Sequence, residues 1–343
     1  MKIIKYSKSS NFYLKQFAGY HKNNDYELLQ VKNENHFYTN QPKRNRCKIC
    51  NKLLNKKVDL IQFGVKYKVC DHCNHLNGNF QDNEKFCNFL YLDLNNKSYN
   101  KNLKDNNYYN RTRLIYDPKA KFLIDTSPIK NLNILDIGCG TGNFVFSLLK
   151  KNINVVGIDI SKSSIEYGNY FIEKKFNINP LFLVTNKDFF NKISNSNCNL
   201  LSAIGVLEHI RDLKKFIKCF QISNIEYIYY SIPMFSLSVF IENAFNNIFP
   251  RHLSGGHTHL FTKNSIEKLN ELLGVKIISE WWFGADIQDF YRSLIVQNMK
   301  NKTSKSMIEF LNKNFLKDID KIQKIVDKSQ FCSEVHILAK KIR

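Results

Sequence analysis

Acidic residues are scarce in this chain. Its 343 residues include 30 Asp and Glu against 51 Lys and Arg, which gives a formal net charge of +21. Lys is spread over every segment, as on an ordinary solvated surface, and no basic run is interleaved with aromatic residues as a strand-binding groove would need. The charge by itself therefore does not predict a nucleic-acid partner, although it keeps one open as an alternative.

Cysteines and long apolar runs are also few. Nine cysteines are too sparse for a disulfide scaffold. The longest uncharged stretch, 227–241, contains Pro233 and falls short of the roughly 20 residues that a membrane span needs. The first residues carry charge but no apolar core, so we expect no signal peptide. With 43% hydrophobic and 13% aromatic residues the chain can bury a core, and we expect a soluble, cytoplasmic protein with reduced cysteines.

The length predicts about two domains. Shifts in composition divide the chain into an N-terminal segment that is a tail or an extra strand, a cysteine-rich unit, an Asn- and Lys-rich linker or helical cap, and a large domain with two insertions. These are residues 1–40, 41–92, 93–125 and 126–343, with the insertions at 234–252 and 285–330.

The large domain alternates short apolar runs with stretches of helical periodicity. The expected strands are 134–137, 155–160, 181–184, 200–204 and 227–232, and the expected helices between them are 143–151, 163–175 and 212–220. Apolar strands without alternation are typical of a parallel sheet that is buried on both faces. We therefore predict an α/β, Rossmann-like fold with a mostly parallel sheet and helices on both faces.

The cysteine-rich unit contains two C-x-x-C pairs, Cys47/Cys50 and Cys70/Cys73, with nineteen residues between them. This spacing is typical of a zinc ribbon, in which two tight turns bring four thiolates to one tetrahedral site. Apolar residues on both sides of Gly64 predict a hairpin between the pairs. The site is expected to be structural, because four thiolates leave no open position. Unrelated cysteines or a redox pair remain the alternatives.

Other cysteines and histidines near this unit have simpler interpretations. His72 and His75 are expected to be surface histidines, although either one can replace a cysteine ligand. The remaining cysteines have no partner at C-x-x-C spacing and are expected to be core thiols: Cys87, Cys139, Cys198, Cys219 and Cys332.

A glycine-rich loop follows the first strand of the large domain. Residues 138–142 read Gly-Cys-Gly-Thr-Gly, with Asp136 just before them, and the next strand ends at Asp159. In a parallel sheet this strand–turn–helix unit binds nucleotide-like ligands, and the second acid is placed to accept the ribose hydroxyls. Asp136 would repel a pyrophosphate but suits a cationic amine. The two acids together fit S-adenosylmethionine, and a turn needed only for tight packing is the alternative.

These residues resemble the class I S-adenosylmethionine-dependent methyltransferases. Residues 136–142 match the first motif of that family, Asp159 matches its ribose-binding acid, and 200–210 resemble its fourth-strand motif. The resemblance implies a seven-stranded sheet. It also implies cofactor contacts from Asp136, Gly138, Cys139, Gly140, Gly142, Asp159, Ile160, Asn186 and Gly205. At Asn186 the family usually has an acidic residue, and here Asp188 is the next acid along the chain.

The C-terminal part resembles the small-molecule branch of these enzymes. Residues 256–262 and 273–275 carry this likeness, and a preceding ribbon of two C-x-x-C pairs is similar to methyltransferases of deoxysugar and surface-polysaccharide pathways. This implies a sugar or nucleotide sugar as acceptor. The alternatives are an RNA methyltransferase, which would use the ribbon and the basic surface, and a scaffold that binds the cofactor without turnover. Residues 203–209 lack the (Asp/Asn)-Pro-Pro-aromatic loop used to methylate exocyclic amines.

A base is needed only if the acceptor must lose a proton. Glu208 and His209 follow the fourth strand, where they either act near the transferred methyl group or fix a helix start. His257 and His259 lie two residues apart and can be a base, a pair that positions the acceptor, or packing residues. These two histidines alone offer too few ligands for a metal site. The first insertion is expected to be a lid or an amphipathic core helix. The second, 285–330, is expected to be helical and to form a lid or a subunit contact.

Overall fold

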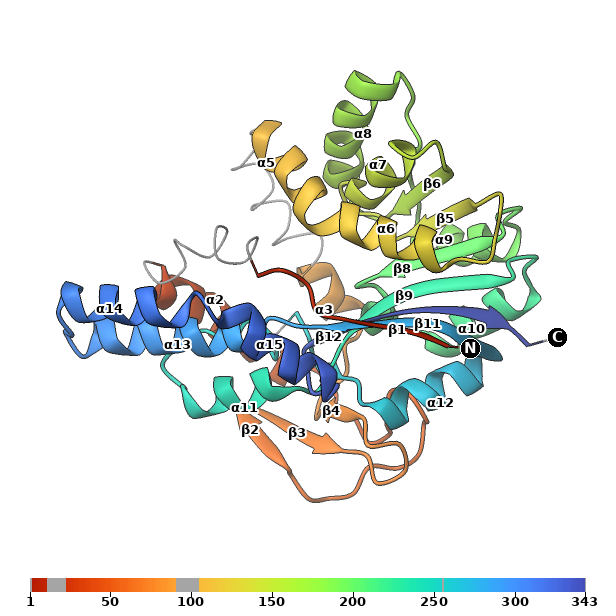
Figure 1. Cartoon of the computed structure of the whole chain (residues 1–343). Helices are drawn as coiled ribbons and strands as arrows, with labels where there is room; N and C mark the ends of the chain where they lie inside the picture. Colours follow the sequence, from red (N-terminus) through yellow and green to blue (C-terminus); the bar gives the residue numbers. More distant parts are fainter. Residues whose placement is uncertain (1, 11–22, 91–104, 255, 343) are drawn as a thin grey trace.

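The computed structural model describes residues 2–10, 23–90, 105–254 and 256–342. Its main feature is one large sheet of eight strands (Figure 1). In spatial order these are β1 (Ile3–Tyr6), β11 (Val275–Phe283), β12 (Glu334–Lys341), β9 (Tyr227–Pro233), β8 (Leu200–Ile204), β5 (Asn133–Ile137), β6 (Asn154–Asp159) and β7 (Leu181–Leu183).

Strands β5 to β9 run parallel, and β12 is antiparallel to both β9 and β11. The expected α/β fold with a mostly parallel sheet is therefore confirmed. The expectation of seven strands was one short, because residues 3–6 add a parallel strand beside β11. The N-terminal segment was expected to be a tail or an extra strand, and residues 3–6 form that strand.

Helices cover both faces of the sheet. One face packs against α6 (Asp117–Thr126), α7 (Asn143–Leu149) and α8 (Lys162–Phe176), and the other against α9 (Asn186–Ser194), α10 (Leu213–Ile222) and α12 (Lys263–Leu273). Successive strand residues point to opposite faces, so Ile134 and Leu135 belong to different apolar clusters. Because successive strand residues are buried on opposite faces of the sheet, the strands are continuous apolar runs in the sequence.

The cysteine-rich unit forms a second, antiparallel sheet. It contains β2 (Leu60–Gln62), β3 (Val65–Val69) and β4 (Leu76–Gly78), and its fourth strand is β10 (His259–Leu260) from the large domain. The predicted hairpin is present, and Phe63 and Gly64 both have positive φ, at 47° and 82°, as a two-residue type I′ turn requires. Pairing of β4 with β10 fixes the ribbon against the large domain.

Helices also form before and after the ribbon strands, up to the start of α6. They are α2 (Asn24–Thr39), α3 (Glu84–Asn88), α5 (Asp105–Arg111) and the π-helical turn η3 (Thr112–Tyr116). Residues 93–104 of the expected linker lie outside the described residues, and the remainder of that segment is helical. Among the expected core thiols only Cys332 is buried. Cys139, Cys198 and Cys219 are half-buried and pack against the apolar clusters, as expected of thiols near the core. Cys87 is half-buried and belongs to neither of these two clusters, so the expectation was wrong there.

Both insertions are helical. The first contains α11 (Leu237–Ala244), and the second contains α13 (Asp286–Lys300), α14 (Lys305–Phe315) and α15 (Ile319–Lys328). The hydroxyls of Ser236 and Ser238 each donate to Asp286 at 2.8 Å, which joins α11 to α13. Helices α13 and α14 lie side by side and extend beyond the sheets (Figure 1). None of the helices in the described ranges has the length and apolar character to cross a membrane.

Candidate functional site

The glycine-rich loop lies at the carboxyl ends of β5 and β6, where parallel sheets bind ligands. Gly138, Gly140 and Gly142 all have positive φ, between 52° and 66°, which side chains other than glycine rarely adopt. A Cβ at Gly138 would approach Val206 to 2.6 Å, whereas a Cβ at Gly140 would meet no protein atom within 4 Å. The loop is thus packed against protein at Gly138 and presents bare backbone at Gly140.

Asp159 ends β6 beside this loop. Its Oδ2 accepts the backbone N–H of Gly140 at 2.8 Å, and its Oδ1 accepts the N–H of Ser161 at 2.8 Å. Burial raises the pKa of Asp159, while these two amides oppose the shift. Each carboxylate oxygen has a further lone pair, so the same group can accept the two hydroxyls of a ribose.

Asp136 lies inside the sheet two residues before the loop. Its side chain is 3% exposed and accepts a hydrogen bond from the Ser202 hydroxyl at 2.6 Å. Burial raises the pKa of Asp136 to about 7, with a smaller contribution from Asp159. A buried carboxyl group with this pKa is stabilised as a carboxylate by an incoming cation such as an ammonium group.

Asn143 holds the loop rather than facing a ligand. Its Nδ2 donates to the Thr112 hydroxyl at 2.8 Å, and its Oδ1 accepts from Thr141 at 2.7 Å. The side chain therefore connects the glycine turn to η3, which precedes β5 in the sequence. This contact spans 31 residues, and no motif in the sequence predicts it.

The other predicted cofactor residues border the same edge. Cys139 donates its N–H to the carbonyl of Ile158 at 3.1 Å, and Ile160 follows Asp159 half-buried. Gly205 follows β8, has a φ of 65° and donates its N–H to the Ser231 hydroxyl at 3.0 Å. Asn186 begins α9, and its side chain lies outside the described part of the structure.

Glu208, His209 and His257 form a polar cluster next to Gly205. A Cβ on Gly205 would lie 3.7 Å from Glu208 Oε1, and this oxygen is 3.8 Å from His209 Nε2. The rings of His209 and His257 are stacked, with centroids 5.8 Å apart. Burial raises the pKa of Glu208 to about 8 and lowers that of His209 to about 3, so both groups are predominantly uncharged at neutral pH.

His259 lies apart from this cluster and connects the ribbon to it. Its Nε2 donates to the backbone carbonyl of Glu208 at 2.8 Å, and its Nδ1 is 2.8 Å from His75 Nε2. His75 is fully buried, so the expectation of a surface histidine was wrong. Lys48, between the first two cysteines, donates to the same Glu208 carbonyl at 2.8 Å. Lys48 in the first cysteine turn and His259 in β10 thus both hold the backbone carbonyl of Glu208.

The loop that carries His257 is held by a buried carboxylate on α11. Glu242 accepts the N–H groups of Arg251 and His252 at 2.7 Å and that of Leu253 at 3.0 Å. His252 points its Nε2 at the Met234 carbonyl, 2.6 Å away, and its own carbonyl accepts from His257 Nδ1 at 2.9 Å. Sequence reasoning missed Glu242, because a lone Glu in an apolar run carries no motif.

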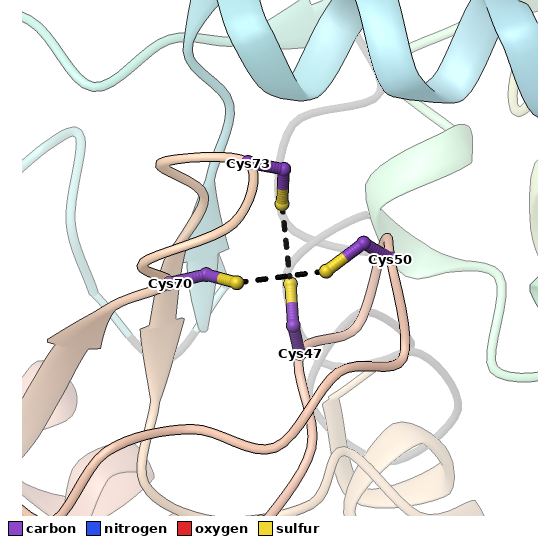
Figure 2. A group of neighbouring side chains, drawn as sticks. All are labelled: Cys47, Cys50, Cys70 and Cys73. Carbon is purple, nitrogen blue, oxygen red and sulfur yellow. Dashed lines mark hydrogen bonds between the residues drawn. The ribbon is translucent and has the colours of Figure 1, made fainter.

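The four cysteines of the two C-x-x-C pairs point toward one centre from two turns (Figure 2). One ligand atom from each lies within 4.8 Å of the others, with Sγ–Sγ distances of 3.6 Å for Cys47–Cys73 and 3.5 Å for Cys50–Cys70. A tetrahedral ion bound at a Zn–S distance of about 2.3 Å requires sulfurs about 3.8 Å apart. Hydrogen bonding from Cys73 lowers the pKa of Cys47 to about 5, which favours a thiolate. The residues fit a structural zinc ion.

The fold and the two acids around a glycine turn define a Rossmann-like protein built to bind a nucleoside-containing cofactor. A family model described as "Methyltransferase domain" matches residues 129–330, more than half of the chain. The chain belongs to this family of methyltransferase domains.

Individual relatives match shorter parts. A ubiquinone biosynthesis O-methyltransferase of Pelagibacter ubique is 30% identical over 115 residues, which cover 32% of this chain and 44% of that relative. A tRNA/tmRNA (uracil-C(5))-methyltransferase of Nautilia profundicola is 26% identical over 102 residues, covering 30% of this chain and 28% of the relative. A solved SAM dependent methyltransferase from Archaeoglobus fulgidus has a TM-score of 0.42 at 18% identity, covering 69% of this chain and 100% of that one. The chain spans less than half the length of the two curated relatives, from Pelagibacter ubique and Nautilia profundicola.

Proposed function

We propose that this protein transfers a methyl group from S-adenosylmethionine to a hydroxyl of a small molecule. The observation that carries the proposal is the placement of Asp136 and Asp159 on neighbouring strands, on either side of a turn with bare backbone at Gly140. When bound, S-adenosylmethionine supplies an activated methyl group on its sulfonium.

Each loop residue would bind a different part of the cofactor. Asp159 would accept the ribose hydroxyls, because backbone amides already hold its carboxylate in place. Asp136 would lie near the amino group, whose positive charge stabilises the ionised carboxylate. Gly140 would let the cofactor approach the backbone, since any side chain there would enter the space that the turn leaves.

The acceptor would lie over Gly205, against Glu208, His209 and His257. Burial lowers the pKa of His257, so the imidazole is neutral and able to take a proton. Its Nδ1 faces the carbonyl of His252, which only accepts hydrogen bonds, so Nδ1 carries the proton and Nε2 the lone pair. His257 therefore orients the acceptor hydroxyl or receives its proton. His259 would not contact the acceptor but would position Glu208, because it holds the backbone carbonyl of that residue.

Zinc in the four-cysteine site would hold the two turns of the ribbon together. Lys48 lies in the first turn and reaches the carbonyl of Glu208, so zinc would also stabilise one wall of the acceptor site. We expect the site to be structural, because four thiolates leave no open coordination position.

For the acceptor we propose a sugar or a nucleotide sugar of surface-glycan biosynthesis. The ribbon ahead of the methyltransferase domain supports this assignment. The O-methyltransferase relatives match only part of the chain but also favour a small molecule with a hydroxyl group over a macromolecule. Incubation with methyl-labelled S-adenosylmethionine and a panel of nucleotide sugars tests the proposal. We expect label in one of them and none with the Asp159→Ala variant.

RNA is the second candidate acceptor. A groove between the first cysteine turn and the start of α10 is lined by the basic residues Lys43, Arg44, Arg46, Arg211 and Lys214. Asp82 and Glu84 pair with Arg44 and Arg211, which weakens the positive field of the groove. We therefore expect weak RNA binding that disappears between low and physiological salt. Salt-resistant binding to one RNA hairpin, with label transferred to it, would favour the RNA assignment instead.

A further inference from the structure

Two groups of side chains in the described ranges have the geometry to hold a metal ion. One is the four-cysteine site, and the other is the cluster of Glu208, His209 and His257, where one ligand atom from each lies within 4.8 Å of the others. We propose that this second cluster binds a divalent transition-metal ion that contacts the acceptor. The inference rests on the proposed function only for the identity of that acceptor.

The carboxyl group of Glu208 is the first argument. The residue is 4% exposed, and its Oε2 has no hydrogen-bond partner. A buried, unpaired carboxyl oxygen is costly, and native structures rarely leave one without a partner. The rings of His209 and His257 lie beside this carboxyl group, and each offers a ligand atom within 4.8 Å of it. A divalent cation between these groups would satisfy the orphan oxygen.

The state of His257 is the second argument. Its Nδ1 donates to the carbonyl of His252, which leaves the Nε2 lone pair available for a metal. With the metal bound, this lone pair would hold the ion instead of accepting a proton, so His257 would orient the acceptor through the metal. Histidine ligands in metal sites commonly donate their other nitrogen to a carbonyl or carboxylate in this way. The support extends outward, because Glu242 holds the backbone N–H of His252 at 2.7 Å. The carbonyl of His252 therefore sets one tautomer of the His257 ring.

The donor set separates this cluster from the cysteine site. Two imidazoles and one carboxylate match catalytic metal sites, which keep positions open for water or substrate. Glu208 Oε1 lies 3.7 Å from the position of a Cβ on Gly205, so the open positions would be at the cofactor edge of the sheet. A hydroxyl oxygen of the acceptor that binds there would lose its proton more readily, because a metal ion lowers the pKa of bound oxygen.

Cobalt binding tests the inference without any cofactor. The full chain, with its ribbon loaded with zinc, is titrated with Co²⁺ and followed by visible absorption. We expect one further Co²⁺ per chain with weak d–d bands and without thiolate charge-transfer bands. His257→Ala and Glu208→Gln should each weaken binding at least about tenfold, since losing a supporting residue alone costs that much. His72→Ala, which removes an exposed histidine of the ribbon, should leave binding unchanged.

The outcomes separate this inference from the proposed function. Thermal unfolding confirms that the variants are folded, and calorimetry measures S-adenosylmethionine binding on the same samples. Cofactor binding without the extra Co²⁺, or Co²⁺ bound equally well by both ligand variants, would overturn the second metal site and leave methyl transfer standing. Co²⁺ bound as expected by a protein that ignores S-adenosylmethionine would support the metal site and reject the proposed function.

Discussion

The pH dependence of cofactor affinity follows from the burial of Asp136. Its pKa is about 7 in the protein without ligand, because burial penalises the charged form. At about pH 5.5 only about 3% of the molecules carry the carboxylate, and at about pH 7.5 about three quarters do. The α-ammonium of S-adenosylmethionine stays largely protonated over this range, so it meets a carboxylate only in the ionised fraction.

The cofactor should therefore bind about 25-fold more tightly at the higher pH, a difference of about 1.9 kcal/mol. Isothermal calorimetry at the two pH values measures this directly. The raised pKa of Asp159 acts in the same direction, so Asp136→Asn serves as the control and should bind weakly with a much smaller pH effect. Equal affinity of the wild type at both values would refute the placement of the ammonium beside Asp136.

Four further substitutions test the site and its support. Asp159→Ala removes a charged acceptor worth about 1.5–3 kcal/mol and should weaken S-adenosylmethionine binding at least about tenfold by calorimetry, whereas Asp125→Ala, on the surface, should not. Gly140→Val should weaken it further, because the added side chain enters the ligand space at a φ of 52°. Cys47→Ser should lose one zinc per chain by elemental analysis and lower the melting temperature; a folded wild type without metal would contradict the ribbon. Lys48→Met removes the charged donor to the Glu208 carbonyl and should lower the free energy of unfolding by about 1.5–3 kcal/mol. It should also slow methyl transfer without changing cofactor affinity, and Lys52→Met, at an exposed lysine, is its control.

Local motifs made much of the fold and site predictable. The glycine loop, Asp136 and Asp159 lie within one strand–turn–helix–strand unit, and the cysteine pairs lie at the two ends of one hairpin segment, so spacing alone indicates which groups meet. Contacts between distant segments were not predictable. His75 meets His259 across 184 residues and Lys48 meets Glu208 across 160, and both contacts depend on how the ribbon docks through β10. No periodicity in a single segment encodes that docking.

The same reason explains why the cluster of Glu208, His209 and His257 could not be predicted from the sequence. His257 lies in a loop far along the chain from Glu208 and His209, and only the fold brings it to them. Sequence analysis treated His257 and His259 as one pair of candidate site residues, because they lie two positions apart in the chain. In the structure their rings have different partners, His252 for one and His75 for the other.

Calorimetric titration of the wild-type protein with S-adenosylmethionine is the most direct test of cofactor binding at the glycine loop. We predict one binding site per chain that is lost or weakened at least about tenfold in Asp159→Ala, with the demethylated product S-adenosylhomocysteine competing for the same site. A folded wild-type protein that shows no binding of either molecule, or a variant that binds like the wild type, would contradict it.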